Sequence, residues 1–400
     1  MRYDYDAVVV GGGISGLTAA AYLCRHDIRT LLLEKTEGLG GLVNTFDRHG
    51  FKFDGGARAF ENSGILFPML KNLDIEMEFV SHPVMLAISD ERVELRTVVD
   101  IDRYGAMLKA YFPENAADID KIIAEIRKIT GYLDVIYGID NPLFRDDMKD
   151  PEYLKATLLP WFLQYAKSMW KIRKLKEPVY DYLGQFTDNV ALIDMIAQHF
   201  FAGTPTFFAL SYFGLYLDYA YPKQGTGALA EELARYIDAN GGAIRTGKGV
   251  REVYARQHSL ALTTGEYVNY KKLIWAADQR TFYSMLKGAD TKPVERRAAL
   301  VKDAAVADSV LTVFAGVNRP PESFADKLNP HTFYTPKTAG ISSLPTPKDA
   351  ADNAIDDWLD RYLERTTYEI SCPALRNPKL APRGKTGLIL SRQQLEIPFS

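Results

Sequence analysis

The stretch Val8-Val9-Val10-Gly11-Gly12-Gly13-Ile14-Ser15-Gly16 ends a β-branched apolar run and begins a helix-like pattern. Residues 5–10 are typical of a buried parallel strand, and the helical periodicity starts at Ile14. Gly11 permits a tight turn, Gly13 lets backbone N–H groups approach a pyrophosphate, and Gly16 lets the helix pack closely on the strands. The helix N-terminus adds partial positive charge. The stretch therefore predicts a strand, turn and helix that hold a dinucleotide phosphate.

A second apolar run, Leu31-Leu32-Leu33, leads directly to Glu34. A carboxylate at the end of the second strand can accept hydrogen bonds from both ribose hydroxyls, and it disfavours a phosphate on the ribose, so we do not expect NADP. Strand, helix, strand and acid in this order favour a dinucleotide site over a purely structural glycine turn. The contacts predicted in this unit are Gly11, Gly12, Gly13, Ile14, Ser15, Gly16, Glu34 and Lys35.

The residues after Glu34 decide which dinucleotide is expected. A nicotinamide enzyme normally continues with another strand–helix–strand repeat, whereas this chain has a second glycine pair and then an acid–glycine turn after Phe53. This arrangement favours FAD. The predicted contacts continue with Gly40, Gly41, Leu42, Asp54, Gly55, Gly56, Ala57 and Arg58. For Arg58 two interpretations stay open, a contact to the flavin or a solvated turn residue.

These residues resemble the flavoprotein superfamily of amine oxidases, and within it the phytoene desaturase, carotenoid isomerase and retinol saturase group. Residues 221–229, 241–250, 273–278 and above all 371–385 extend the resemblance over most of the chain. It implies an FAD-dependent oxidoreductase, a desaturase, saturase or isomerase, that transfers a hydride at flavin N5 and acts on a lipophilic polyene or isoprenoid such as a carotenoid precursor. It also implies cofactor contacts from Val250, Ala276 and Ala277.

The chain departs from the family pattern in three places. Leu42 stands where many relatives have an arginine, and the turn at residues 55–58 differs from that of the phytoene desaturases. The usual C-terminal FAD-binding segment is not recognisable before the chain stops at Leu395-Glu396-Ile397-Pro398-Phe399-Ser400. We interpret this as a truncation, which predicts weaker FAD binding.

The predicted fold class is α/β: a three-layer, Rossmann-like FAD-binding domain with a discontinuous α+β substrate domain. The FAD-binding domain is expected at residues 1–95 and 221–287, and the substrate domain at 96–220 and 288–400. Isoleucines at helical spacing predict a helix over residues 118–137, and residues 227–240 predict another that ends at Gly241.

The insert between Pro151 and Tyr221 carries the information on the substrate. Its many aromatic residues favour either an apolar tunnel for a polyene or a packed helical core. Residues 161–176 alternate apolar and basic side chains, which is typical of a helix at a membrane surface but also of a solvated basic face. His199 is either a pocket proton donor or a packed histidine. No catalytic acid or base can be identified from the sequence.

Composition limits the remaining classes of function. The chain has 400 residues and a net charge of −3 without a basic tract, so we expect no nucleic-acid partner. The six histidines show no metal-like spacing, and the two cysteines, Cys24 and Cys372, lie far apart, so neither a metal site nor a disulfide is predicted. The first strand begins near the N-terminus, which leaves no room for a targeting segment and predicts a cytoplasmic protein, peripheral to a membrane if the basic helix binds one. The oligomeric state stays open.

Three alternatives to a polyene oxidoreductase remain: an amine-oxidase-type flavoenzyme with a polar substrate, an NAD-dependent dehydrogenase, and a truncated flavoprotein fold without activity.

Overall fold

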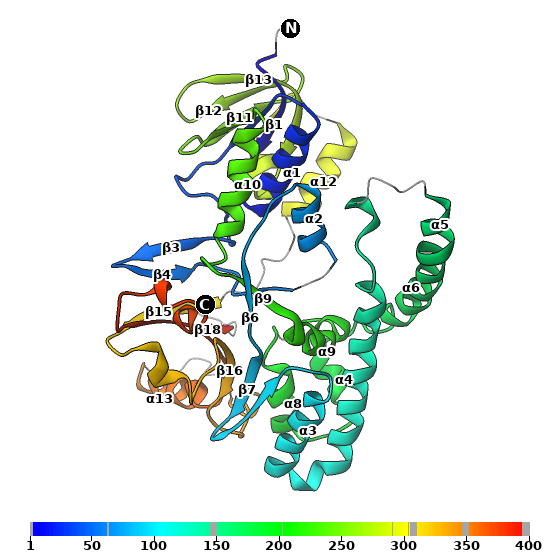
Figure 1. The fold of residues 1–400 in the computed structure, drawn as a ribbon, viewed down its shortest axis with the longest axis vertical. Helices are drawn as coiled ribbons and strands as arrows, with labels where there is room; N and C mark the ends of the chain where they lie inside the picture. Colours follow the sequence, from blue (N-terminus) through cyan, green and yellow to red (C-terminus); the bar gives the residue numbers. More distant parts are fainter. Residues whose placement is uncertain are drawn as a thin grey trace.

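The computed structural model describes residues 3–61, 64–144, 150–201, 203–289, 291–302, 304, 310–345 and 352–393. Two large sheets dominate the described chain, one at the top of Figure 1 and one at its lower left, with a group of helices at the lower right. The stretch at residues 395–400, on which the predicted truncation rests, lies outside the described residues.

The first sheet contains the predicted strand–helix–strand unit. The central strand β1 (Tyr5–Val10) is parallel to β2 and β13, and β2 is parallel to β10. Beyond β13 the sheet continues with antiparallel β12 and β11. The other strands in sheet order are β10 (Ala243–Arg245), β2 (Thr30–Leu33), β13 (Tyr267–Trp275), β12 (Ser259–Leu262), β11 (Val250–Tyr254) and β14 (Leu286–Lys287).

Alternating side chains of β1 divide this region into three layers. Val9 is fully buried in a cluster with residues of α1 (Ile14–Arg25) and α10 (Ala228–Ala239). Val8 and Val10 point to the opposite face, where they join residues of β11 and β12, with α11 (Gln279–Met285) packed against them. Because successive strand residues face opposite sides, an unbroken valine run is buried on both faces. The predicted three-layer α/β fold is confirmed.

The second sheet is mostly antiparallel and packs against helices. Its strands in order are β15 (Val310–Val317), β18 (Thr386–Gln393), β17 (Tyr368–Ser371), β16 (His331–Thr335), β7 (Val84–Ile88) and β8 (Glu91–Leu95). Its helical partners are α3 (Asp100–Tyr111), α4 (Ala116–Ile136), α8 (Val190–Ala197) and α9 (Thr206–Leu215). The isoleucines that predicted α4 are buried in the shared core.

The predicted division into domains differs from the structure at the hairpin of β7 and β8. The prediction places residues 84–95 with the FAD-binding part, but β7 pairs with β16 in the second sheet. Leu86 and Ile88 share a core with Ile101 and Ile126 of α3 and α4. The hairpin lies there because its apolar face is buried against these helices.

Short strands connect the two sheets. Strands β3 (Thr45–Arg48) and β4 (Phe51–Asp54) form a hairpin, and β5 (Phe60–Glu61) follows it. Both β5 and β6 (Phe79–Ser81) pair with β9 (Tyr219–Pro222). Further helices of the described chain are α6 (Leu159–Ile172), α7 (Val179–Leu183), α12 (Lys292–Lys302), α13 (Asp352–Leu363) and α14 (Pro373–Arg376). Within the described ranges, no helix is long and apolar enough to cross a bilayer. Cys24 and Cys372 are both buried and free.

Candidate functional site

Backbone atoms in close contact hold the turn between β1 and α1. Gly11 has a φ of +113°, and a Cβ atom there would lie 2.5 Å from Ala276 O. At Gly16 an added Cβ would lie 1.9 Å from Gly11 O. A side chain at either position collides with backbone, so both positions require glycine.

The start of α1 faces open space. Gly13 is the N-cap. Among the described residues, no side chain caps the helix, and an added Cβ at Gly13 would meet no atom within 4 Å. Ile14 packs against the adjoining core, whereas Ser15 is exposed in the first turn. Uncapped N–H groups that face free volume suit a phosphate. This geometry fits the predicted dinucleotide.

Glu34 follows β2 and lies against the same turn. Its Oε2 accepts a hydrogen bond from Gly12 N at 2.6 Å, and its Oε1 accepts from Thr36 N at 2.9 Å and Thr36 Oγ1 at 2.8 Å. Burial acts to raise the pKa of this carboxyl, but the hydrogen bonds outweigh it and lower the pKa. Glu34 is therefore a fixed anion at the position expected for the ribose acid.

A cavity of about 260 Å³ opens beside Glu34. It gathers five of the predicted residues, namely Gly11, Glu34, Lys35, Val250 and Ala277. Trp275, Lys248 and Met285 also line it and were not predicted as contacts. Residues from β1, β2, β11 and β13 meet here because these strands belong to one sheet.

The second glycine pair lies against the first glycine run. Gly40 N donates to Gly12 O at 2.8 Å, and an added Cβ at Gly41 would lie 3.3 Å from Gly13 Cα. Leu42, which follows, leaves 79% of its surface exposed. Leu42 O accepts from Ala57 N at 2.9 Å, so this segment pairs with the turn after Asp54. At Gly56 an added Cβ would lie 2.2 Å from Leu42 O, and at Gly55 one would lie 2.0 Å from Asn44 Oδ1.

Asp54 is fully buried, and protein groups surround its carboxylate. Oδ1 accepts from Thr226 N at 2.9 Å and from Thr45 Oγ1 at 2.8 Å, and Oδ2 accepts from Tyr221 OH at 2.7 Å. The side chain thus joins β4 to the segment between β9 and α10. Its direct role is to fix the turn at residues 55–58.

Arg58 is buried, so the interpretation as a solvated turn residue is wrong. Only 7% of the surface of Arg58 is exposed. Its guanidinium donates hydrogen bonds to Gly56 O at 2.7 Å and to Asp54 O. It also donates to Ser391 Oγ on β18 at 3.0 Å. Arg58 therefore ties the glycine-rich turn to the second sheet. Contact between Arg58 and a flavin stays a prediction.

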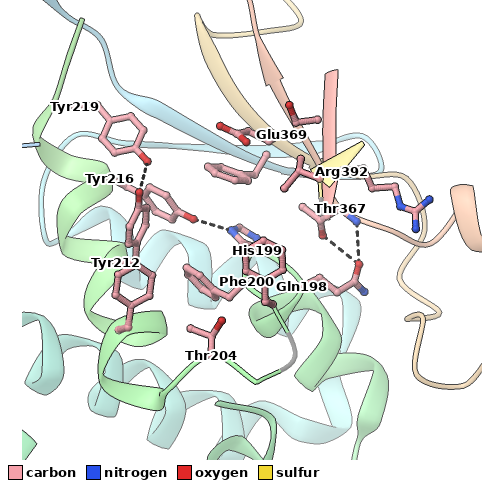
Figure 2. Close-up of a pocket in the computed structure, with 15 residues that line it drawn as sticks. Gln198, His199, Phe200, Thr204, Tyr212, Tyr216, Tyr219, Thr367, Glu369 and Arg392 are labelled. Carbon is pink, nitrogen blue, oxygen red and sulfur yellow. Dashed lines mark hydrogen bonds between the residues drawn. The ribbon is translucent and has the colours of Figure 1, made fainter. Parts of the chain in front are cut away.

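On the other side of Ser391 lies a second cavity of about 260 Å³, between the helices and the second sheet. Figure 2 shows its aromatic wall of three tyrosines opposite Gln198, Thr367 and Arg392. Its lining residues are Gln198, His199, Phe200, Phe201, Thr204, Phe208, Tyr212, Tyr216, Tyr219, Val310, Phe333, Thr367, Glu369, Ser391 and Arg392. The volume is just below the usual range of roughly 300–1,000 Å³ for small-molecule pockets.

Glu369, which is half-buried, brings a negative charge to this cavity. Its Oε1 lies 3.1 Å from His331 Nε2, and the positive charges of Arg58 and Arg376 are close enough to affect it. Burial acts to raise the pKa of the Glu369 carboxyl, but His331 and the two arginines outweigh it and lower the pKa. Glu369 is therefore held as a carboxylate.

Other polar groups in the lining differ in what they can do. Burial lowers the pKa of His199 to about 3, so its imidazole is neutral near pH 7; Nδ1 lies 3.2 Å from Tyr216 OH. Gln198 Nε2 and Arg392 Nε are buried, and neither has a hydrogen-bond partner among the described residues.

Sequence patterns found part of this cavity. Six of the aromatic residues that the insert contributes line it, namely Phe200, Phe201, Phe208, Tyr212, Tyr216 and Tyr219. Others, such as Phe213 and Tyr182, pack in or against the helical core, as the second interpretation of the aromatic set expects. A polyene tunnel stays a prediction. Glu369 was missed. The available signal was a charged residue in the Tyr-Glu-Ile-Ser strand β17, close to the stretch at residues 371–385.

The basic, apolar segment predicted at residues 161–176 forms most of α6. Phe162, Leu163 and Trp170 are 53%, 63% and 60% exposed, and Lys174 Nζ lies 3.9 Å from the centre of the Trp170 ring. The solvent-facing side of α6 therefore carries large apolar side chains beside basic ones.

Comparison with known proteins agrees with the fold. A family model described as an NAD(P)-binding Rossmann-like domain matches residues 9–73. A chloroplastic prolycopene isomerase from Arabidopsis thaliana is 23% identical over 95% of this chain and 62% of its own length. An all-trans-retinol 13,14-reductase from Danio rerio is 23% identical over 94% of the chain and 61% of its own length.

The chain thus spans about three fifths of the length of these relatives. Among solved structures, a putrescine oxidase variant has a TM-score of 0.59 and 13% identity, over 98% of this chain and 76% of its own. The predicted resemblance to phytoene desaturase-like oxidoreductases is confirmed by the isomerase and the reductase. The likeness to the oxidase concerns the fold alone.

Proposed function

We propose that this chain is an FAD-dependent oxidoreductase that desaturates, saturates or isomerises a lipophilic polyene or isoprenoid. The observation that carries the proposal is the contact between Arg58 and Ser391, because it places an aromatic cavity directly beside the glycine-rich turn. The names of the two relatives, a prolycopene isomerase and a retinol reductase, support a polyene substrate.

The cradle at β1 and α1 fits the ADP half of FAD. The first glycine run and Glu34 would hold the pyrophosphate and ribose, and the cavity beside Val250 and Ala277 would take the adenosine. The turns at residues 40–42 and 55–58 would contact the rest of the cofactor. When bound, FAD supplies hydride acceptance and donation at N5.

The cavity lining supports an apolar substrate with one polar end. Aromatic rings make up one wall, and these can bind a conjugated chain through stacking and exclusion of water. The polar side chains of Gln198, Thr367 and Arg392 lie on the side opposite the tyrosines in Figure 2, which suits a substrate with one polar end.

The exposed face of α6 supports entry of the substrate from a membrane surface. Apolar side chains such as Leu163 and Trp170 would enter the headgroup region, while Lys171 and Lys174 would meet anionic lipid. This contact would make the protein peripheral to a membrane.

The test is to incubate the FAD-loaded chain, oxidised or reduced, with prolycopene and with all-trans-retinol and to identify products by chromatography. An isomerised, desaturated or saturated product supports the proposal. If neither polyene changes while the flavin is bound, the proposed substrate class is wrong.

An amine-oxidase-type reaction is the second candidate, because a tyrosine wall and a half-buried carboxylate, Glu369, would also suit a cationic amine. The positive charges of Arg58 and Arg376 already compensate that charge, which favours the polyene. Amine-dependent formation of hydrogen peroxide would identify this alternative.

A further inference from the structure

A chain of hydroxyl groups leads from the aromatic cavity to a carboxyl group. Tyr219 OH donates to Tyr212 OH at 3.2 Å, and Tyr212 OH donates to Glu61 Oε1 at 2.9 Å. Tyr219 and Tyr212 both line the cavity, and Figure 2 shows their hydroxyls facing each other. Glu61 is half-buried on β5, opposite Tyr219 on β9 in the strand register.

We propose that Tyr219, Tyr212 and Glu61 form a proton relay between the cavity and the protein surface, with Tyr219 as the residue that exchanges a proton with the substrate carbon. The proposal rests on the proposed function, since it supplies the proton that a hydride transfer requires. Exposed Asp218, whose charge acts on Glu61, marks the surface end.

The other titratable groups of the cavity are less suited to this role. His199 is neutral, because burial lowers its pKa to about 3, and it is therefore a weak proton donor. Glu369 is held as a carboxylate by His331 and the arginines. Tyr216 is hydrogen-bonded to His199 rather than to a group that leads to solvent.

Each hydride transferred to or from the substrate is matched by one proton that passes through the relay. Saturation of a carbon–carbon double bond takes a hydride from a dihydroflavin at one carbon and a proton at the other. As the new C–H bond forms, the O–H bond of Tyr219 breaks. In the structure Tyr219 donates to Tyr212 and Tyr212 donates to Glu61, so the Tyr212 hydroxyl turns toward Tyr219 for this step. The phenolate then takes a proton from Tyr212, Tyr212 takes one from the protonated Glu61 carboxyl, and solvent reprotonates Glu61. In desaturation a proton leaves the substrate carbon and the same shifts run in reverse, while the hydride goes to the oxidised flavin.

Burial raises the pKa of Glu61, so this carboxyl holds a proton more readily than an exposed carboxyl does. Several groups from neighbouring elements also face the relay. They are Tyr137 just after α4, Tyr216 and Asp218 after α9, His331 on β16, Glu369 on β17 and Arg376 on α14.

The first experiment needs neither FAD nor substrate. Tyrosine Cζ is isotope-labelled, and NMR resonances are followed through a pH titration, with Tyr212→Phe and Tyr219→Phe for assignment. We expect the signals of Tyr212 and Tyr219 to shift together with one pKa, that of Glu61, above the ordinary carboxyl range. Glu61→Gln should abolish both shifts. Tyr212→Phe should abolish that of Tyr219.

The second experiment measures turnover of all-trans-retinol by the FAD-loaded, reduced chain. Tyr219→Phe should lower kcat by about 100-fold, the usual contribution of a general acid, while KM stays within about twofold. Glu61→Gln should flatten the dependence of kcat on pH. Tyr182→Phe is the matched control: Tyr182 OH donates to Glu125 Oε2 over the same 2.9 Å but lies outside the cavity, so its kcat and pH profile should match those of the wild type.

Two results would overturn the relay. One is a Tyr219 signal that ignores the titration of Glu61, or that follows it even in Tyr212→Phe. The other is Tyr219→Phe with the turnover and pH profile of the wild type. If the wild type converts no polyene, the proposed function fails, and the NMR titration alone decides whether the three groups are coupled.

Discussion

The cofactor cradle and the aromatic cavity are built in different ways. The cradle consists of backbone in close contact, with Gly16 against Gly11 and Gly40 against Gly12. The cavity consists of side chains from α9 and the segment before it, from β9, and from four strands of the second sheet, far apart in sequence. Arg58 is the direct link between the two. A site made of backbone is therefore encoded locally, whereas a side-chain cavity depends on the whole topology.

The largest expected effect comes from Gly16→Val. An added Cβ would lie 1.9 Å from Gly11 O, and backbone cannot move away as a side-chain tip can. We expect a loss of more than about 3 kcal/mol of unfolding free energy and no FAD uptake. Urea unfolding and flavin titration measure both.

Gly13→Ala is the control for this prediction, because its Cβ would meet no atom within 4 Å. The variant should fold and lose at most about 1 kcal/mol of unfolding free energy. It should bind FAD, but with lower affinity than the wild type. Equal loss of folding in the two variants would contradict a cradle built on close contact at Gly16.

Asp54→Ala should have the next largest effect. It removes the acceptor for Thr226 N, Thr45 Oγ1 and Tyr221 OH inside the protein. Leaving buried donors unpaired predicts a loss of about 3 kcal/mol in unfolding free energy. Asp47→Ala, which changes an exposed aspartate on the neighbouring strand, should cost less than about 1 kcal/mol. Similar costs would mean that Asp54 does not hold the turn.

Glu369→Gln probes the cavity through the pH dependence of stability. The folded-state pKa of Glu369 is lowered, so the unfolded chain binds more protons between that pKa and the ordinary carboxyl value of about 4.3. The stabilisation is therefore complete above about pH 5 and is lost as pH falls through the folded pKa. Urea unfolding between about pH 5 and 3 should show a shallower decline for the variant. Parallel curves for variant and wild type would exclude a lowered pKa of Glu369.

The smallest effect on folding is expected for the double variant Leu163→Ser and Trp170→Ser. Both side chains are more than half exposed, so unfolding free energy should change by less than about 0.5 kcal/mol. Flotation with anionic vesicles should nevertheless fall by about tenfold. Leu300→Ser on α12, which is 58% exposed, is the control and should float like the wild type. Unchanged flotation of the double variant would exclude α6 as the membrane contact.

Local patterns were sufficient for much of the fold. The strand predicted at residues 5–10 has the same bounds as β1, and the regularly spaced isoleucines that predicted a helix all lie in α4. Both signals are short-range: burial of a strand on two faces and of a helix on one. The glycine and acid positions of the cradle follow from the same unit of about fifty residues, because adjacent parallel strands meet there.

The rest depends on contacts between distant segments. No local signal places the hairpin at residues 84–95 in the second sheet, since its partner β16 lies more than 240 residues away. The same holds for Arg58, whose partner Ser391 is 333 residues away. Glu61 could not be connected with Tyr212 before β5 and β9 were known to pair.

The central claim is that the chain binds FAD in the cradle beside the aromatic cavity. The most direct test is a titration of the purified chain with FAD, and separately with NAD, followed by visible absorption of the protein fraction after gel filtration. The account predicts a yellow protein that retains FAD, with binding lost in Gly16→Val and weakened in Gly13→Ala. A colourless protein that releases FAD and binds NAD tightly would contradict it.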